Sequence, residues 1–223
     1  MTESRSAQAL FQAAYENRYT WEPNFPGYTA TVEFKHGDQA LTGTIVVKAN
    51  LSAEVTGIED EEARKSIIGQ LREVAIHRVR RTFTETHGMN TFAYGETDAT
   101  GAIEILMPEK PMGDRYKLRN NEVCHVHRHL HGIMVTIDTF SSHDTGAGYL
   151  SHRYDSIYAD PATGEIKSDK IVFEDNYQKV GNYQILSQRI VAAIEDGQPV
   201  TTEFNFTNIA LLADRVEAAA VAV

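Results

Sequence analysis

The sequence predicts an α+β fold in which one strongly curved antiparallel sheet, a half-barrel, carries helices on its concave side. The order of elements along the 223 residues is a helix, three strands, a second helix and then a long run of strands, which is typical of α+β proteins. Short turns join the strands, so neighbours in sequence are expected to pair in antiparallel fashion. A sheet of this many strands curls instead of staying flat.

The chain length suits a single domain, which we expect over residues 1–213. The last ten residues, 214–223, are rich in Ala and Val, and we expect them to fray.

Two helices are expected before the main run of strands. The first covers residues 6–18, where apolar side chains recur at helical spacing: Ala7, Leu10, Phe11, Ala14 and Tyr15. The second covers residues 60–81. Its acidic start and its arginine-rich end both suit the helix dipole.

The strands are predicted from period-two alternation of apolar and polar residues, or from runs of β-branched and aromatic residues between turn signals. They are expected at residues 28–35, 41–48, 51–58, 92–97, 102–106, 123–140, 149–158, 170–177, 183–191 and 200–211. A loop is expected at residues 108–113, and a hairpin turn centred on Gly146 is expected to place Thr139 opposite Arg153.

Composition and charge exclude several classes of protein. The net charge of −10 lacks the basic footprint of a nucleic-acid-binding protein. The single cysteine, Cys124, excludes an internal disulfide, and no apolar run is long enough to cross a bilayer. The first residues lack the apolar segment of a secretory signal, so a cytoplasmic location is expected, or a stromal one if the source is a plastid.

The most unusual motif is His125-Val-His127-Arg-His129-Leu-His131, which holds four of the nine histidines. On a strand, these imidazoles would lie on one face, about 6.5–7 Å apart. Two neighbours could share a zinc, copper or nickel ion, and His127 and His129 are the candidate metal ligands. A wall of a ligand pocket and an ordinary polar sheet face are the alternatives.

Aromatic residues recur along the predicted strands, and in a half-barrel they would line a cavity for a small molecule. The candidate ligand-binding residues are His125, His127, His129, His131, Tyr149, Tyr154 and Arg153. A haem, with an imidazole as its axial ligand, is a further possible cofactor. The sequence contains none of the common catalytic motifs, so we predict no catalytic residues and lean against an enzyme.

The order of elements, together with three stretches in the C-terminal part of the chain, resembles the LolA-like lipoprotein-carrier half-barrel. Asp160-Pro-Ala-Thr-Gly164-Glu resembles its two-strand corner, and the segments from Asn182 and from Val200 to Ile209 resemble its closing strands. The resemblance implies a curved sheet that holds a hydrophobic cargo against helices.

A second resemblance is carried by the run from His127 to Thr136 and by the segment from Asp144 to His152. Both are similar to an uncharacterised protein family found in cyanobacteria and plant plastids. This resemblance implies a photosynthetic host, but it implies no mechanism and no site residues.

Three functions are therefore open. The first is a non-enzymatic binding or carrier protein for a hydrophobic or amphipathic small molecule held between the sheet and the helices. The second is a metal- or haem-dependent protein that uses the strand from His125 to His131. The third is an assembly or regulatory partner of other proteins in a photosynthetic host.

Overall fold

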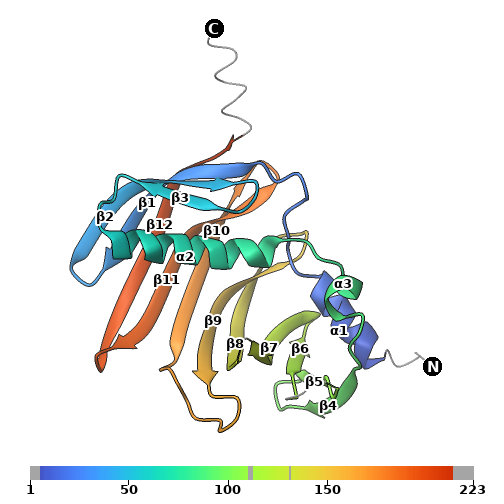
Figure 1. Cartoon of the computed structure of the whole chain (residues 1–223). Helices are drawn as coiled ribbons and strands as arrows, with labels where there is room; N and C mark the ends of the chain where they lie inside the picture. Colours follow the sequence, from blue (N-terminus) through green and yellow to red (C-terminus); the bar gives the residue numbers. More distant parts are fainter. Residues whose placement is uncertain (1–5, 110–112, 131, 213–223) are drawn as a thin grey trace. The chain divides into compact units, whose positions relative to one another are not determined.

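The structure is a computed structural model that describes residues 6–109, 113–130 and 132–212 (Figure 1). The described helices are α1 (Ala7–Glu16), α2 (Glu61–Arg78) and α3 (Phe83–His87). The described strands are β1 (Gly27–His36), β2 (Gln39–Lys48), β3 (Ala53–Thr56), β4 (Ala93–Thr97), β5 (Ile103–Leu106), β6 (Arg115–Arg119), β7 (Glu122–Leu130), β8 (Ile133–Asp144), β9 (Tyr149–Ala159), β10 (Ile171–Val180), β11 (Tyr183–Glu195) and β12 (Gln198–Leu211).

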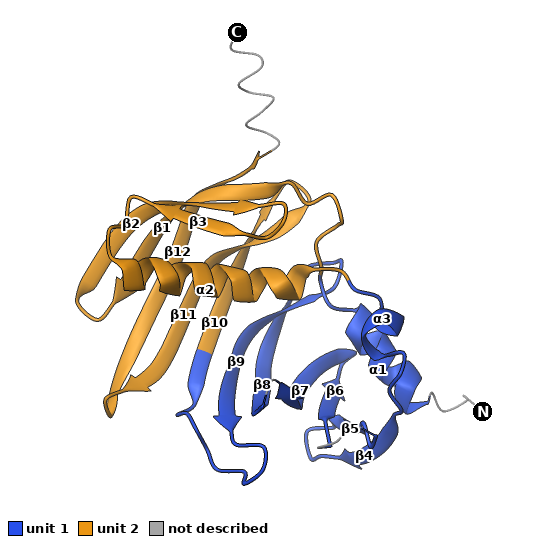
Figure 2. Ribbon diagram, viewed as in Figure 1, with its two compact units in different colours: residues 1–19, 81–172 blue, residues 20–80, 173–223 orange. Residues whose placement is uncertain are grey.

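The described strands form one antiparallel sheet in the order β3-β2-β1-β12-β11-β10-β9-β8-β7-β6-β5-β4. The predicted α+β class with a single antiparallel sheet is confirmed. Two compact units divide the chain (Figure 2): unit 1 comprises residues 1–19 and 81–172, and unit 2 comprises residues 20–80 and 173–223. The prediction of one domain over residues 1–213 stays a prediction, and the tail at 214–223 lies outside the described residues.

The prediction of a single strand over residues 123–140 was wrong, because this segment forms β7 and β8 of an antiparallel hairpin. The chain reverses at Gly132, whose φ of 81° is open to glycine at little cost. Two short elements were missed, namely β6 and α3, since five residues carry too little periodicity to be recognised. The second helix also ends at Arg78 instead of residue 81.

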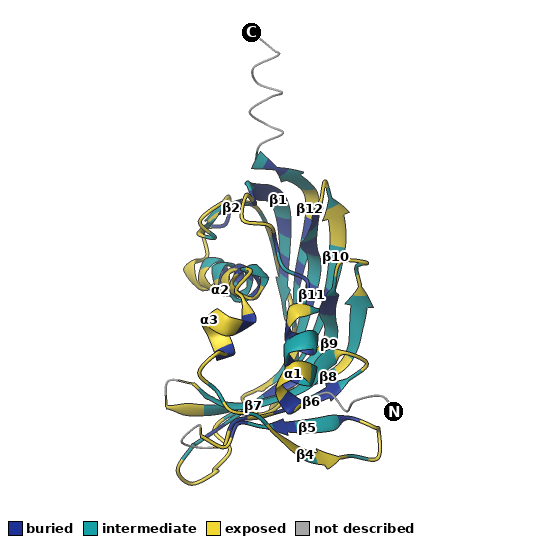
Figure 3. Ribbon diagram, turned by 90° about the vertical axis from the view of Figure 1, so that its right-hand side faces the viewer, coloured by how far each residue is buried: buried dark blue, intermediate teal, exposed yellow. Residues whose placement is uncertain are grey.

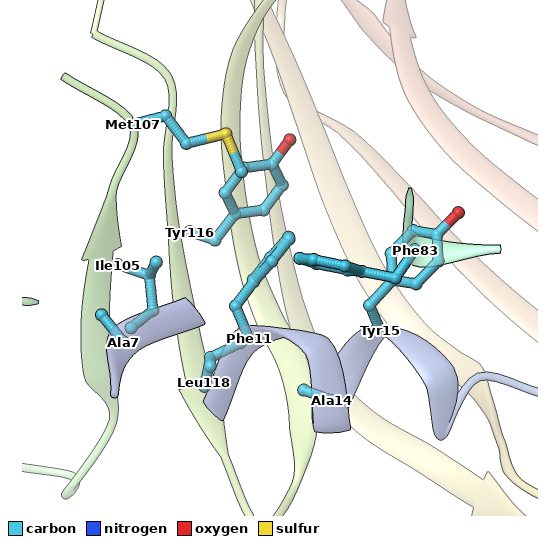
Figure 4. Close-up of a cluster of buried hydrophobic side chains, with 9 residues drawn as sticks. All are labelled: Ala7, Phe11, Ala14, Tyr15, Phe83, Ile105, Met107, Tyr116 and Leu118. Carbon is cyan, nitrogen blue, oxygen red and sulfur yellow. The ribbon is translucent and has the colours of Figure 1, made fainter. Parts of the chain in front are cut away.

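In unit 1, α1 packs its apolar stripe against the sheet. The hydroxyl of Ser6 caps the helix by accepting a hydrogen bond from the Ala9 amide at 3.1 Å. Phe11 is the centre of the packing, with its ring 4.8 Å from that of Tyr116 on β6 and 5.4 Å from that of Phe92. The buried cluster around it, drawn in Figure 4, consists of Ala7, Phe11, Ala14, Tyr15, Phe83, Ile105, Met107, Tyr116 and Leu118.

Backbone hydrogen bonds hold the end of α1 against the start of β9. The Tyr149 amide donates to the Asn17 carbonyl at 2.9 Å, and the Tyr19 amide donates to the Tyr149 carbonyl at 2.9 Å. Gly148 makes this approach possible, since a Cβ there would lie 2.6 Å from the Asn17 carbonyl oxygen. The position of α1 on the sheet is therefore fixed by backbone geometry as well as by apolar packing.

In unit 2, α2 covers one face of the sheet, and its buried side lies toward the strands while its other side is exposed (Figure 3). The buried stripe of α2 is Ala63, Ile67, Leu71, Val74 and Ala75. Beneath the helix lies Arg189 of β11, which is only 2% exposed.

Arg189 is held by a buried ion pair and by α2. Its Nε and Nη2 donate to the two carboxylate oxygens of Asp175, each at 2.7 Å, and Asp175 is also 2% exposed. Its Nη1 donates to Gln70 Oε1 of α2 at 2.7 Å and lies 3.5 Å from Glu73 Oε1. The bidentate geometry satisfies both charges, and the third contact ties the helix to the sheet.

We predict that Asp175→Asn lowers the free energy of unfolding by about 3–5 kcal/mol, because it removes the bidentate carboxylate of the buried Arg189 and leaves it with the longer charge contact to Glu73. The double variant Asp175→Leu with Arg189→Met should lose less of the free energy of unfolding, since both desolvated charges are removed together. Unfolding in urea measures the stability of both variants. Lys65→Ala, which removes the exposed pairs of Lys65 with Glu61 and Glu62, is the control and should change stability little. A double variant no more stable than Asp175→Asn would contradict this account.

Candidate functional site

The register of β6, β7, β8 and β9 divides the side chains of unit 1 between two faces of the sheet. Tyr116, Val126 and Ile137 are directly opposite one another on successive strands and lie on the side covered by α1, which we call the helix face. Lys117, His125 and Asp138 form the neighbouring row and point the other way. We call that side the histidine face.

On the histidine face, each described histidine of β7 has an oxygen partner on an adjacent element. His125 Nδ1 lies 2.7 Å from Asp138 Oδ1, and His127 Nδ1 lies 2.9 Å from Thr136 Oγ1, both on β8. His129 Nδ1 lies 3.2 Å from Asp114 Oδ1, which also accepts from the His129 amide at 3.0 Å. These contacts fix the orientation of each ring through Nδ1.

His127 is distinguished from its neighbours by its surroundings. Its ring centre is 6.0 Å from that of His129. Burial lowers the pKa of His127 below the ordinary 6.5, and the positive charge of Arg115 with the neighbouring His125 and His129 acts in the same direction. Asp114 opposes these effects in part. The electrostatics of this face thus favour a neutral imidazole at His127.

Acidic and basic residues extend the row that passes through His125. Lys117 Nζ lies 2.9 Å from Asp98 Oδ2. At the other end of the row, Asp155 is opposite Asp138 and pairs with Lys170 at 2.7 Å. Asp155 is 3% exposed, so the Lys170 contact compensates a buried carboxylate.

The helix face carries two buried polar atoms that have no hydrogen-bond partner among the described residues. These atoms are Nε of Arg128 on β7 and Oγ of Ser156 on β9. Arg128 is opposite Val135, and Ser156 is opposite Ile137, so both sit among apolar side chains. From the strand spacing and the rise per residue, their Cα atoms are about 12 Å apart.

Two tyrosines predicted as ligand-binding residues also lie away from the histidines. Tyr154 shares the helix face with Ser156, two positions further along β9. Tyr149 is buried at the start of β9, where its hydroxyl accepts a hydrogen bond from the Val123 amide at 3.1 Å. Burial raises the pKa of Tyr149 to about 12, so it stays a neutral phenol.

The expected register of the hairpin around Gly146 was wrong. Arg153, which is exposed, is opposite Ser141, and Thr139 is opposite Tyr154. Irregularities of the ladder between Thr139 and Ser142 shift the pairing, and a bulge leaves no signal in apolar alternation.

A second pair of histidines, His143 on β8 and His152 on β9, was not singled out from the sequence. Their ring centres are 4.3 Å apart. Only the cross-strand pairing brings them together, since they are nine positions apart in the chain.

The predicted ligand-binding residues that the structure describes therefore do not all lie on one face of the sheet. His125, His127 and His129 lie together, Tyr154 lies on the opposite face, and His131 lies outside the described residues. Within the described part of the chain, no group of three His, Cys, Asp or Glu residues has the geometry to hold a metal ion. Arg128 and Ser156 were missed as a pair, because only the strand pairing places them on one face.

None of the described helices is long and apolar enough to span a membrane.

Comparison with known proteins gives one family and one similar structure. Residues 2–212 match the model of the family described as "Protein of unknown function (DUF3386)". The crystal structure of the LolA superfamily protein NE2245 from Nitrosomonas europaea is similar to this chain over 93% of its length and 94% of that chain, with a TM-score of 0.36 and 10% sequence identity. No curated protein sequence matches the chain.

We predict that stability falls less steeply with decreasing pH in His127→Gln than in the wild type. The pKa of His127 is lowered by folding, so below pH 6.5 the unfolded chain binds its proton more tightly and the unfolding free energy decreases. Replacing His127 by glutamine removes the titrating imidazole and with it this contribution to the pH dependence of the unfolding free energy. Unfolding in urea at pH 7.5 and pH 5.5 measures the difference, and an equal loss of stability in both proteins would show that His127 titrates as it does in the unfolded chain.

Proposed function

The chain belongs to the DUF3386 family of proteins of unknown function, and from that premise we propose that it is a non-enzymatic protein that binds or carries an amphipathic small molecule with an acidic head group. The ligand lies on the helix face of unit 1, on the sheet beside the apolar cluster that α1 covers. The observation that carries this proposal is the pair of buried polar atoms, Arg128 Nε and Ser156 Oγ, which lie among apolar side chains and have no hydrogen-bond partner in the described part of the chain.

The first argument is energetic. A buried polar group without a hydrogen bond costs about 1–3 kcal/mol, and more if it is charged, so native proteins rarely leave one unsatisfied. Two on one sheet face are readily explained if a bound molecule completes their hydrogen bonds. Arg128 is half-buried as a residue, and its Nε is the buried nitrogen that lacks a partner among the described residues.

The second argument is chemical. A guanidinium prefers a carboxylate or phosphate, which it can bind through two parallel hydrogen bonds. The rest of the neighbourhood suits a hydrocarbon: Val126 and Ile137 are adjacent in the ladder, and Val135 is 5% exposed. A molecule with an acidic group at Arg128 and an apolar tail along these side chains satisfies both requirements.

Tyr116 supports the placement of positive charge on this face. Burial raises the pKa of Tyr116, and the charge of Arg128 acts against that increase. The guanidinium is therefore close enough to the aromatic cluster beneath α1 for its field to be felt there. This proximity supports a head group beside the apolar cluster that α1 covers.

A second candidate function is metal binding by His127 and His129. The favouring observation is that Nδ1 of each ring already contacts an oxygen of a neighbouring residue, which leaves Nε2 as the available nitrogen. Metal-binding histidines commonly use this arrangement, in which the second nitrogen is oriented by an oxygen partner. The Nε2 atoms of the two imidazoles would then bind the metal ion, and water molecules would complete its coordination. Haem and a protein partner stay predictions from the sequence.

We predict that Arg128→Gln weakens binding of decanoate about tenfold or more while leaving the affinity for 1-decanol unchanged, because only the carboxylate pairs with the guanidinium. Displacement of the neutral dye Nile red measures both affinities. Arg153→Gln, which removes an exposed arginine of β9, is the matched control and should leave both unchanged. The proposal fails if neither amphiphile displaces the dye and native mass spectrometry of freshly purified protein finds no small molecule bound.

The metal-binding candidate predicts that untagged wild-type protein takes up one zinc ion, and that the double variant His127→Gln with His129→Gln does not. The double variant His143→Gln with His152→Gln removes the other histidine pair and should keep the ion. Isothermal titration with zinc chloride and elemental analysis give the stoichiometry. Equal, near-zero zinc in all three proteins excludes this function.

A further inference from the structure

A small polar cavity opens where β7 and β8 separate. The ladder between these strands runs from Leu130 opposite Ile133 to His125 opposite Asp138. Beyond that pair, the register of β8 against β9 shifts between Thr139 and Ser142. A cavity of about 180 Å³ is lined by residues of β7 and β8 in this region.

The start of β7 is held by contacts other than β8. The Val123 amide donates to the Tyr149 hydroxyl at 3.1 Å. Cys124, the extra residue in the pairing of β7 with β6, places its sulfur 3.4 Å from the Lys117 carbonyl oxygen. The gap between the strands is therefore a stable feature of this hairpin and leaves room for a ligand.

The lining of this cavity is almost entirely polar and carries both signs of charge. It consists of Arg119, Asn120, Glu122, Cys124, Thr139, Phe140, Ser141 and Ser142. Arg119 and Glu122 are directly opposite each other at the end of the β6–β7 hairpin, so the lining has no net charge. Hydroxyl and amide groups, which both donate and accept hydrogen bonds, make up most of the remainder.

One of these hydroxyls points to a ligand independently of the cavity. Ser141 Oγ is buried and has no hydrogen-bond partner among the residues that the structure describes. Because this oxygen is enclosed by protein atoms, a molecule in the cavity would complete its hydrogen bonds once the Ser141 side chain rotates toward it.

A largely exposed aromatic residue, Phe140, is one of the residues that line this cavity. Phe140 is the residue of β8 that falls between the Thr139–Tyr154 and Ser141–Arg153 pairs, and it is 57% exposed. The face of an aromatic ring carries negative charge density that attracts polarised C–H groups. Such a ring beside donors and acceptors matches a molecule with one apolar face and hydroxyls around its edge.

We infer that this cavity, formed by Arg119, Glu122, Phe140 and Ser141, binds a neutral polyhydroxylated molecule of monosaccharide size. The volume equals that of roughly six water molecules, which suits a ring with a few hydroxyls and is too small for a lipid or a nucleotide. Arg119 and Glu122 would bond vicinal hydroxyls, Ser141 would complete its hydrogen bonds, and Phe140 would pack against the ring C–H groups. Burial raises the pKa of Cys124, so the neighbouring thiol stays neutral and binding is non-covalent.

This site is separate from the helix face, because Arg119 and Glu122 share the register of the row that points away from α1. The amphiphile and the sugar can therefore be tested independently on the full-length protein. Titration of ¹⁵N-labelled protein with D-glucose, followed by amide NMR, gives location and affinity together. We expect saturable shifts at Glu122, Cys124, Ser141 and Ser142.

Ser141→Ala and Glu122→Gln should each raise the glucose Kd about five- to tenfold, since each removes one hydrogen-bonding group. Phe140→Ala should raise it by a similar factor. Tyr94→Ala removes an aromatic of β4 that is 47% exposed and serves as the matched control, with an unchanged Kd. Thermal unfolding checks that each variant is folded.

The inference is overturned if glucose and galactose produce no saturable shifts around the gap, or if the three variants bind as the wild type does. It is also overturned if glycine or inorganic phosphate saturates these amides and the sugars do not, because the cavity would then select charge.

Discussion

The antiparallel register between β7 and β8 decides which chemistry each surface of unit 1 presents. With Val126 opposite Ile137, the alternation of the strand sends His125 and His127 to one face and Arg128 to the other. A slip of one residue would exchange the two sets and place imidazoles beneath α1. The apolar packing of Val126 under the helix and the turn at Gly132 hold the register against such a slip. The composition of the histidine face and of the helix face therefore depends on that alignment.

The two units secure their helices by different physical means. In unit 1, Phe11 and its aromatic neighbours hold α1 through buried apolar area, to which the backbone bonds between Asn17 and Tyr149 add direction. In unit 2, α2 has a thinner apolar stripe and is positioned by the buried pair of Arg189 and Asp175 together with Gln70. A buried ion pair contributes little net stability, but it is strict in geometry, since each lone pair and proton must find a partner. The polar contact therefore specifies where the helix lies.

The surfaces of unit 1 differ in whether their polar side-chain atoms already have hydrogen-bond partners within the protein. On the histidine face, carboxylates and a hydroxyl already contact Nδ1 of each described histidine of β7. On the helix face and in the strand gap, Arg128, Ser156 and Ser141 keep buried atoms without partners among the described residues. Because an unpaired buried polar atom is costly, these positions point to ligands more directly than the histidines do. The histidines of the repeated motif are thus not the residues whose buried polar atoms lack hydrogen-bond partners in the described part of the chain.

The sequence by itself determined the α+β class, the two longer helices and the period-two alternation that puts His125, His127 and His129 on one side of a strand. These features depend on local spacing, which apolar periodicity and turn residues encode directly. Only the tertiary structure decided that residues 123–140 form a hairpin, that Arg153 is opposite Ser141, and that Arg128 and Ser156 share the face beneath α1. Those relations depend on cross-strand register and on bulges, which are set by packing between segments distant in the chain and leave no mark in local composition.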